Sequence, residues 1–268
     1  MMPEFHGLLD EHAEGLRKPL YLQGQSGLAV ELDGRSLRVS QTERAAMLYP
    51  LVRLARVLSK GEVRWSCEAL LACAVASVPV VFLDREGSVR GYLFGPSSGG
   101  DILYPCLRAG IRRSNGWGRY ADWRRTMKIH ARRALELQLR RAHVVQGRVL
   151  AWLGWRPIGQ GMVNGILDAQ VMRRLHGVLT GFSAQLLLEA GLDAERLDIL
   201  EPLPLVDDLA ELLEWVLAES LLTAMQCEGE PEFVSDERAL VALVESQRNE
   251  VCRFGRLLLG YLQHWMDH

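Results

Sequence analysis

The densest group of acidic residues in the chain is Asp207-Asp208, followed by Glu211 and Glu214. On a helix, Asp207, Glu211 and Glu214 would share one face, and Asp208 would lie about 100° around the axis. Clustered carboxylates of this kind can hold Mg²⁺ or Mn²⁺. An acidic helix start that complements the helix dipole has the same composition and is the commoner use of such residues. The pattern by itself leaves both interpretations open.

A strongly basic segment runs from Arg108 to Arg148. It carries twelve basic residues against two acidic ones, a net charge of +10 in a chain whose overall charge is −2. All but one of the twelve are arginine, which suits bidentate contact with phosphate. The segment predicts a polyanion site. The candidate DNA-binding residues are Arg112, Arg113, Arg119, Arg124, Arg125, Lys128, Arg132, Arg133, Arg140 and Arg141.

Aromatic residues are interleaved with these arginines. Trp117, Tyr120 and Trp123 could stack on bases or sugars. The alternative is a solvated helix face that pairs with the acidic region between Glu189 and Glu250, which is how most charged runs are used. A structure distinguishes the two, because arginines in a binding site face solvent and paired arginines face carboxylates.

Other sequence motifs are few. No HExxH, P-loop, GxGxxG or GxSxG pattern occurs, the seven histidines are scattered, and none of the five cysteines forms a CxxC pair. We therefore expect reduced, buried thiols in a cytoplasmic protein. The amino terminus lacks the pattern of a signal peptide, and no apolar run reaches the roughly 18–20 residues of a membrane span.

The elements that must position these residues fall into two parts. Residues 1–95 predict a β-rich domain, organised around the stretch Ala69–Phe94: a helix capped by Ser66, a buried strand at Val80–Leu83, a turn ending at Gly87, and a return strand. Short strands are expected before it at Leu20–Leu22, Gly27–Leu32, Ser36–Val39 and Val63–Trp65, whereas Tyr49–Leu58 suits either a strand or a short helix.

Residues 96–104 predict a linker, because Pro96 to Gly100 is rich in Pro, Ser and Gly. Beyond it the apolar period becomes helical, and residues 105–268 predict an all-helical domain. Gly191 suits a helix C-cap and Ser235 a helix N-cap. The fold class is therefore α+β. Helices are expected over Tyr120–Leu153, Met162–Ala190, Leu205–Met225 and Asp236–Met266.

With both parts laid out, the chain resembles the spacer-acquisition integrase of CRISPR systems, the family called Cas-one. The resemblance runs from Leu20 through nearly the whole chain and is carried by LYLQGQSGLAVELDG and YPLVRLARVLSKGEVRWSCEALLACAVASVPVVFLDREGSVRGYLFG. It implies a sheet domain that makes a dimer interface, followed by a DNA-binding helical domain.

The family holds a divalent metal, Mg²⁺ or Mn²⁺, through a Glu, a His and an Asp. By the resemblance, Gln146 stands where the Glu is expected and Leu200 where the His is expected, while Asp208 is kept. Gln is a poor ligand for a hard cation and Leu cannot coordinate one. Asp208 is thus the candidate catalytic and metal-binding residue, with Glu211 and Asp207 as further candidate ligands, in a degenerate site.

Three functional hypotheses follow. The first is a dimeric CRISPR-adaptation protein in antiviral defence that binds double-stranded DNA, with its metal-dependent phosphoryl transfer weakened or lost, and that partners the small Cas-two protein or another integrase subunit. The second is an active Mg²⁺- or Mn²⁺-dependent endonuclease or integrase that uses other ligands around Asp208. The third is a structural interaction module without nucleic acid, in which basic and acidic helices pair.

Overall fold

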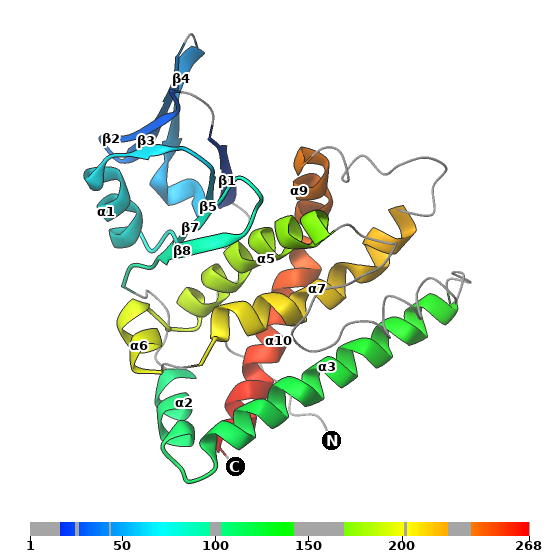
Figure 1. The fold of residues 1–268 in the computed structure, drawn as a ribbon. Helices are drawn as coiled ribbons and strands as arrows, with labels where there is room; N and C mark the ends of the chain where they lie inside the picture. Colours follow the sequence, from blue (N-terminus) through cyan, green and yellow to red (C-terminus); the bar gives the residue numbers. More distant parts are fainter. Residues whose placement is uncertain are drawn as a thin grey trace.

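The computed structural model describes residues 17–24, 27–42, 44–96, 103–141, 169–200, 203–224 and 237–267. Strands occupy the chain up to Leu93 and helices dominate from Leu103 onward (Figure 1). The predicted α+β class, a β-rich first part followed by a larger helical part, is confirmed. Within the described residues, no helix combines the length and apolarity needed to cross a membrane.

The first part contains two four-stranded sheets. One has the order β1-β5-β7-β8 and the other the order β4-β3-β2-β6. In the first sheet β5 pairs in parallel with both β1 and β7, whereas β7 and β8 form an antiparallel hairpin. The strands are β1 (Lys18–Gln23), β2 (Ala29–Asp33), β3 (Ser36–Gln41), β4 (Arg44–Pro50), β5 (Leu54–Lys60), β6 (Arg64–Trp65), β7 (Val80–Leu83) and β8 (Val89–Leu93).

Local signals of the sequence are realised in this part. Ser66 accepts a hydrogen bond from the Ala69 N–H at 3.1 Å and so caps helix α1 (Cys67–Val75). Gly87 has φ +92°, which closes the β7–β8 turn at little steric cost. The ambiguous stretch Tyr49–Leu58 is neither one strand nor one helix: β4 ends at Pro50, a 3₁₀ turn follows over Leu51–Arg53, and β5 begins at Leu54.

The second part consists of packed helices, and one of the predicted helices is divided in two. The predicted helix over Asp236–Met266 is interrupted at Gln247, which separates α9 from α10, and residues 142–153 and 162–168 of two other predicted helices lie outside the described residues. Ser235 lies outside them too. The helices are α2 (Leu103–Ile111), α3 (Gly116–Arg141), α5 (Ala169–Glu189), α6 (Ala194–Ile199), α7 (Leu205–Ala224), α9 (Glu237–Ser246) and α10 (Arg248–Asp267).

Helix α2 was not predicted, although the sequence carried a signal for it. Its buried residues, Leu103, Cys106, Leu107 and Gly110, follow the i, i+3, i+4, i+7 spacing of an amphipathic helix. Pro105 is tolerated because it lies in the first turn, where its missing N–H removes no intrahelical hydrogen bond.

Helix α5 connects the two parts by packing on β5 and β7 (Figure 1). A Cβ atom added at Gly177 would lie 2.6 Å from the Gly87 carbonyl oxygen, and one added at Gly181 would lie 2.8 Å from Leu58 Cδ1. The two glycines thus allow the helix to approach the sheet closely. The helix continues to a C-cap at Gly191, with φ +88°, as the sequence predicted.

A fully buried arginine lies at the same junction. Arg56 of β5 donates from Nη1 to Gln185 Oε1 of α5 at 2.8 Å and forms an ion pair through Nη2 with Glu245 of α9. Its guanidinium carbon lies 3.5 Å from the ring centre of Phe182. Residues of β5 and β7 share one apolar core with the helices, so strands and helices form one packed body.

Candidate functional site

The acidic cluster lies at the start of helix α7. Asp207 and Asp208 occupy its first turn, and the Asp208 N–H donates to the Pro204 carbonyl at 2.8 Å. Leu209, Leu212 and other apolar residues of α7 are buried in the core of the helical part. Burial of this apolar stripe fixes the rotation of the helix and thereby the directions of the carboxylates.

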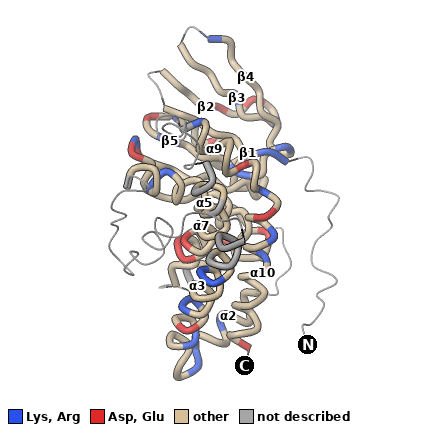
Figure 2. The backbone as a smooth tube through the Cα atoms, turned by 90° about the vertical axis from the view of Figure 1, so that its right-hand side faces the viewer, with Lys and Arg blue, Asp and Glu red and all other residues tan. Residues whose placement is uncertain are grey.

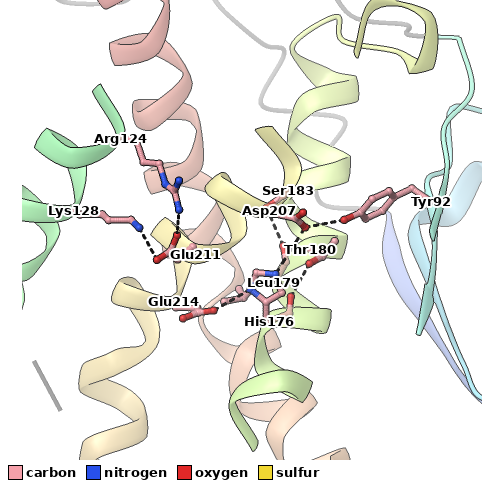
Figure 3. A network of polar contacts seen from close by, with 10 residues as sticks. All are labelled: Tyr92, Arg124, Lys128, His176, Leu179, Thr180, Ser183, Asp207, Glu211 and Glu214. Carbon is pink, nitrogen blue, oxygen red and sulfur yellow. Dashed lines mark hydrogen bonds and ion pairs between the residues drawn. The ribbon is translucent and has the colours of Figure 1, made fainter. Parts of the chain in front are cut away.

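Asp208 and Glu211 contact helix α3. Tyr120 Oη donates to Asp208 Oδ2 at 2.8 Å, and Arg124 Nε lies 2.9 Å from Asp208 Oδ1 in an ion pair. Arg124 Nη2 also donates to Glu211 Oε2 at 2.8 Å. Lys128 Nζ donates to the other oxygen, Glu211 Oε1, at 2.6 Å (Figure 3). Both oxygens of each carboxylate therefore already have partners from α3.

Asp207 and Glu214 contact a different set of residues. His176 of α5 lies between them, with Nδ1 3.0 Å from Glu214 Oε1 and Nε2 3.9 Å from Asp207 Oδ1 (Figure 3). Tyr92 of β8 donates its hydroxyl to Asp207 Oδ1 at 2.8 Å. The four carboxylates thus divide into one pair that faces α3 and one pair that faces α5 and β8.

The environment shifts the pKa values of these groups in different directions. Burial raises the pKa of Asp208, against the opposing effects of Tyr120 and Arg124. Burial also acts against ionisation of Glu211, but the hydrogen bonds from Lys128 and Arg124 outweigh it and hold its pKa below the usual range.

His176 is the titratable group of the second pair. Burial lowers its pKa, but the facing carboxylates of Asp207 and Glu214 outweigh burial and raise the pKa to about 9. The contact with His176 is the main reason that the pKa of Asp207 is held below its ordinary value. Both carboxylates of this pair therefore face a protonated imidazole at neutral pH.

Leu200, which the resemblance places at the family's His position, lies in the apolar core. It directly follows α6, is 2% exposed, and packs in the same cluster as Leu203 and Leu205. Gln146, the residue at the family's Glu position, lies outside the described residues. The structure therefore does not test whether Gln146, Leu200 and Asp208 converge.

The described residues do not fit a divalent metal. Mg²⁺ and Mn²⁺ need several oxygen ligands with free lone pairs. Asp208 is 3% exposed, and the oxygens of Asp208 and Glu211 are occupied by an arginine, a lysine and a tyrosine. In the part of the chain that the structure describes, no three His, Cys, Asp or Glu side chains are placed to bind a metal together.

The basic residues predicted to bind DNA form two groups, one that contacts other parts of the protein and one that faces solvent. Arg124 and Lys128 face the carboxylates of α7, and Arg113 and Arg119 donate to carbonyl oxygens at the end of α10. Arg124 and Lys128 thus pair with acidic residues, as the alternative interpretation of the basic segment predicted. Arg113 and Arg119 instead satisfy carbonyl groups in the last turn of α10. In their present contacts these side chains are directed at the protein.

A second group of basic residues is exposed. Blue segments recur along α3 and near the turn that joins it to α2 (Figure 2). Arg125 forms an exposed ion pair with its helix neighbour Asp122, three residues earlier. Arg140 and Arg141 fall in the last turn of α3. Apart from Arg113, which is exposed but donates to α10, the exposed members of the predicted set with described side chains are Arg112, Arg125, Arg132 and Arg133.

The predicted stacking role of the aromatic residues is wrong for two of three. Tyr120 and Trp123 are 3% and 1% exposed, because they lie on the core-facing side of α3. Trp117 is exposed, so its stacking on bases or sugars stays a prediction. Tyr120 instead orients Asp208 through its hydroxyl.

Sequence reasoning missed His176 and Tyr92 as partners of the acidic cluster. His176 lies 38 positions before Glu214 and Tyr92 lies 115 positions before Asp207. Neither residue stands in a motif with a carboxylate at fixed spacing. Only the packing of α5 and β8 against α7 brings them together.

The comparisons with known proteins agree on the fold. Residues 20–107, from β1 into α2, match the family model for CRISPR associated protein Cas1. No curated protein sequence matches significantly. Among solved structures, a CAS1 protein from Thermotoga maritima aligns with a TM-score of 0.64 and 13% identity, over 94% of this chain and 96% of that chain.

Two nucleic-acid complexes have the same fold. A TtCas1–DNA complex aligns with a TM-score of 0.63 and 16% identity, over 94% of this chain and 92% of that chain. A casposase bound to integration product aligns with a TM-score of 0.63 and 13% identity, over 93% and 90%.

The fold is therefore that of the Cas1 class of proteins, with a strand-rich part that contains two sheets followed by a mostly helical part. Together with the family match, it confirms the resemblance to the Cas1 (Cas-one) family that the sequence indicated.

Proposed function

We propose that the chain is a CRISPR-adaptation protein that binds double-stranded DNA in the cytoplasm, and that its metal-dependent phosphoryl transfer is weakened or lost. The observation that carries the proposal is the Cas1 fold, which it shares with proteins solved on DNA and on an integration product. Insertion of foreign DNA segments into a CRISPR array would then depend on a partner, such as the small Cas2 (Cas-two) protein or another integrase subunit.

The DNA contact is assigned to the exposed face of α3. Arg125, Arg132 and Arg133 are exposed there, so phosphates can reach them from solvent, and the ion pair of Arg125 is to Asp122 of the same helix. Arg124 and Lys128 cannot do so, because they would have to leave Glu211. The proposal therefore narrows the predicted DNA-binding set to its outward members.

Salt-dependent binding tests this assignment. The triple variant Arg125→Gln/Arg132→Gln/Arg133→Gln should bind a labelled duplex at least 10-fold more weakly in fluorescence anisotropy, with a slope of log Kd against log salt that is lower by about 2–3. The control is Arg85→Gln/Arg90→Gln/Arg253→Gln, which removes the same charge from exposed surface pairs elsewhere. Equal weakening in both triples, or salt-independent binding, would reject the assignment.

The weakened chemistry is supported by the partners of the carboxylates. Asp208 and Glu211 contact Arg124 and Lys128, and Leu200 is a core residue that cannot coordinate a metal. An active enzyme that uses other ligands is the competing proposal. Integration of a short duplex into a repeat-bearing plasmid in Mg²⁺ or Mn²⁺ by the wild type, and not by Asp208→Asn, would establish that competitor.

We also propose a homodimer through the strand-rich domain. β4 is the edge strand of its sheet, and Met47 and Leu48 on it and Val52 beyond it are exposed apolar residues. A second copy of β4 could pair antiparallel with it about a two-fold axis and cover this surface. Met47→Glu/Leu48→Glu should convert the dimer to a monomer in light scattering, whereas Leu71→Glu/Val75→Glu on α1 should not.

A further inference from the structure

The carboxylates that a metal would need are already neutralised by cations from the chain itself. Glu211 receives Lys128 Nζ at one oxygen and Arg124 Nη2 at the other. Asp208 receives Arg124 at one oxygen and the Tyr120 hydroxyl at the other. Two carboxylates and two cations leave this half of the cluster with no net charge.

The geometry of this pairing is specific to two helices. Arg124 and Lys128 lie four residues apart on α3, and Asp208 and Glu211 lie three residues apart on α7. Both spacings correspond to about one helical turn, which places each pair on one side of its helix. Arg124 bridges both carboxylates through different nitrogens, as the planar guanidinium allows. Each helix therefore presents its charges in register with the other.

A divalent cation could enter only by displacing these contacts. It would have to strip Lys128 and Arg124 from oxygens at hydrogen-bond distance and then lie beside two positive charges. Asp208, at 3% exposed, offers no free oxygen from which a first contact could begin.

We propose that Arg124 and Lys128 are tethered cations that take the place of a divalent metal at Asp208 and Glu211, so that these carboxylates join α3 to α7 and do not bind Mg²⁺ or Mn²⁺. The proposal deepens the proposed loss of metal-dependent chemistry. It does not rest on DNA binding, so its test uses the full chain without DNA and cannot fail because DNA binding fails.

The sign of a thermal shift separates this arrangement from an empty metal site. In an empty metal site, carboxylates repel one another and Glu211→Gln would raise Tm. In a cation-neutralised site, Glu211→Gln removes the counter-charge of Lys128 and leaves Arg124 with Asp208 alone, and Tm should fall by about 5 °C. The matched control is Glu250→Gln, whose surface partner Arg253 is exposed, and its Tm should change by less than about 2 °C.

Metal titration supplies the second readout. Addition of 5 mM MnCl₂ (about 100 times the Kd of a typical site of roughly 50 μM) should leave the wild-type Tm unchanged, whereas a filled site would raise it by more than about 5 °C. A Mn²⁺-dependent rise that Glu211→Gln abolishes would overturn the proposal. A Tm of Glu211→Gln at or above that of the wild type would also overturn it.

A double-mutant cycle measures the pairing directly. Lys128→Met should lower Tm, and the double variant Lys128→Met/Glu211→Gln should lose less than the sum of the two single losses, because no charge is then left without its partner. Strict additivity would contradict the tethered-cation assignment.

Discussion

Replacement of Arg56 by Met is expected to lower the free energy of unfolding by about 3 kcal/mol. Arg56 is 0% exposed and holds β5 to two helices, through Gln185 of α5 and Glu245 of α9. Met matches the arginine side chain only as far as about the Nε position, so the substitution keeps the aliphatic packing and removes the charge, its hydrogen bonds and the guanidinium contact with Phe182.

The magnitude follows from the surroundings of the charge. Removal of one partner from a buried ion pair costs about 3–5 kcal/mol, because the other charge stays behind without compensation. Glu245 is 23% exposed and keeps the hydrogen bond from the Tyr21 hydroxyl, which places the cost at the lower end of that range. A loss of about 3 kcal/mol lowers the folding equilibrium constant roughly 100-fold.

Urea denaturation followed by tryptophan fluorescence and circular dichroism measures this loss. Because residues of β5 and β7 belong to the same core as the helices, we expect both probes to report a single transition. The control Arg253→Met removes an exposed arginine paired with Glu250, three residues earlier, and should cost no more than about 1 kcal/mol.

Two results would refute this reasoning. A loss below about 1 kcal/mol in Arg56→Met, equal to that of the control, would mean that the buried pair adds nothing to the junction. A second variant checks the cause: adding Glu245→Gln to Arg56→Met should recover part of the loss, since the unpaired carboxylate is then neutral. A further loss of stability in the double variant would contradict the ion-pair explanation.

Three further predictions concern the helical part. The wild type should have a higher free energy of unfolding than His176→Asn at acidic pH, because folding raises the pKa of His176 to about 9. This difference should be complete below pH 6.5 and should vanish as the pH rises through about 9. Urea titrations at pH 6 and 9.5 measure the difference. Gly177→Ala should lower the free energy of unfolding by about 1–2 kcal/mol, because the added Cβ would meet the Gly87 carbonyl. Gly260→Ala on α10 has nothing within 4 Å of its Cβ and should raise the free energy of unfolding by about 0.5–1 kcal/mol. An increase in both variants would disprove the close approach of α5 to the sheet. Leu200→His should cost about 2–4 kcal/mol in urea unfolding, because it buries an imidazole in the core, and an unchanged stability would show that the position is open to solvent.

Much of the fold could be predicted because its signals are local. Ser66 caps α1, Gly87 closes the β7–β8 turn, and Gly191 ends α5, each through hydrogen bonds or dihedral angles that involve neighbouring residues. The break between α9 and α10 at Gln247 could not be predicted in this way, because the apolar period continues through it.

The acidic cluster shows where local reasoning ends. The helical period grouped Asp207, Glu211 and Glu214 on one face and set Asp208 apart. In the structure Glu211 acts with Asp208, and Asp207 with Glu214. Glu211 lies about 40° from Asp207 and about 60° from Asp208 around the axis, so either neighbour is within reach of its side chain.

The sequence by itself determined that the carboxylates would lie together on one helix and that an arginine-rich helix would precede them. The tertiary structure decided which charges meet. Arg124 lies 87 positions before Glu211, and His176 lies 38 positions before Glu214. No local spacing encodes such contacts, because the rotation and distance of α3, α5 and α7 are set by burial of their apolar faces in a common core.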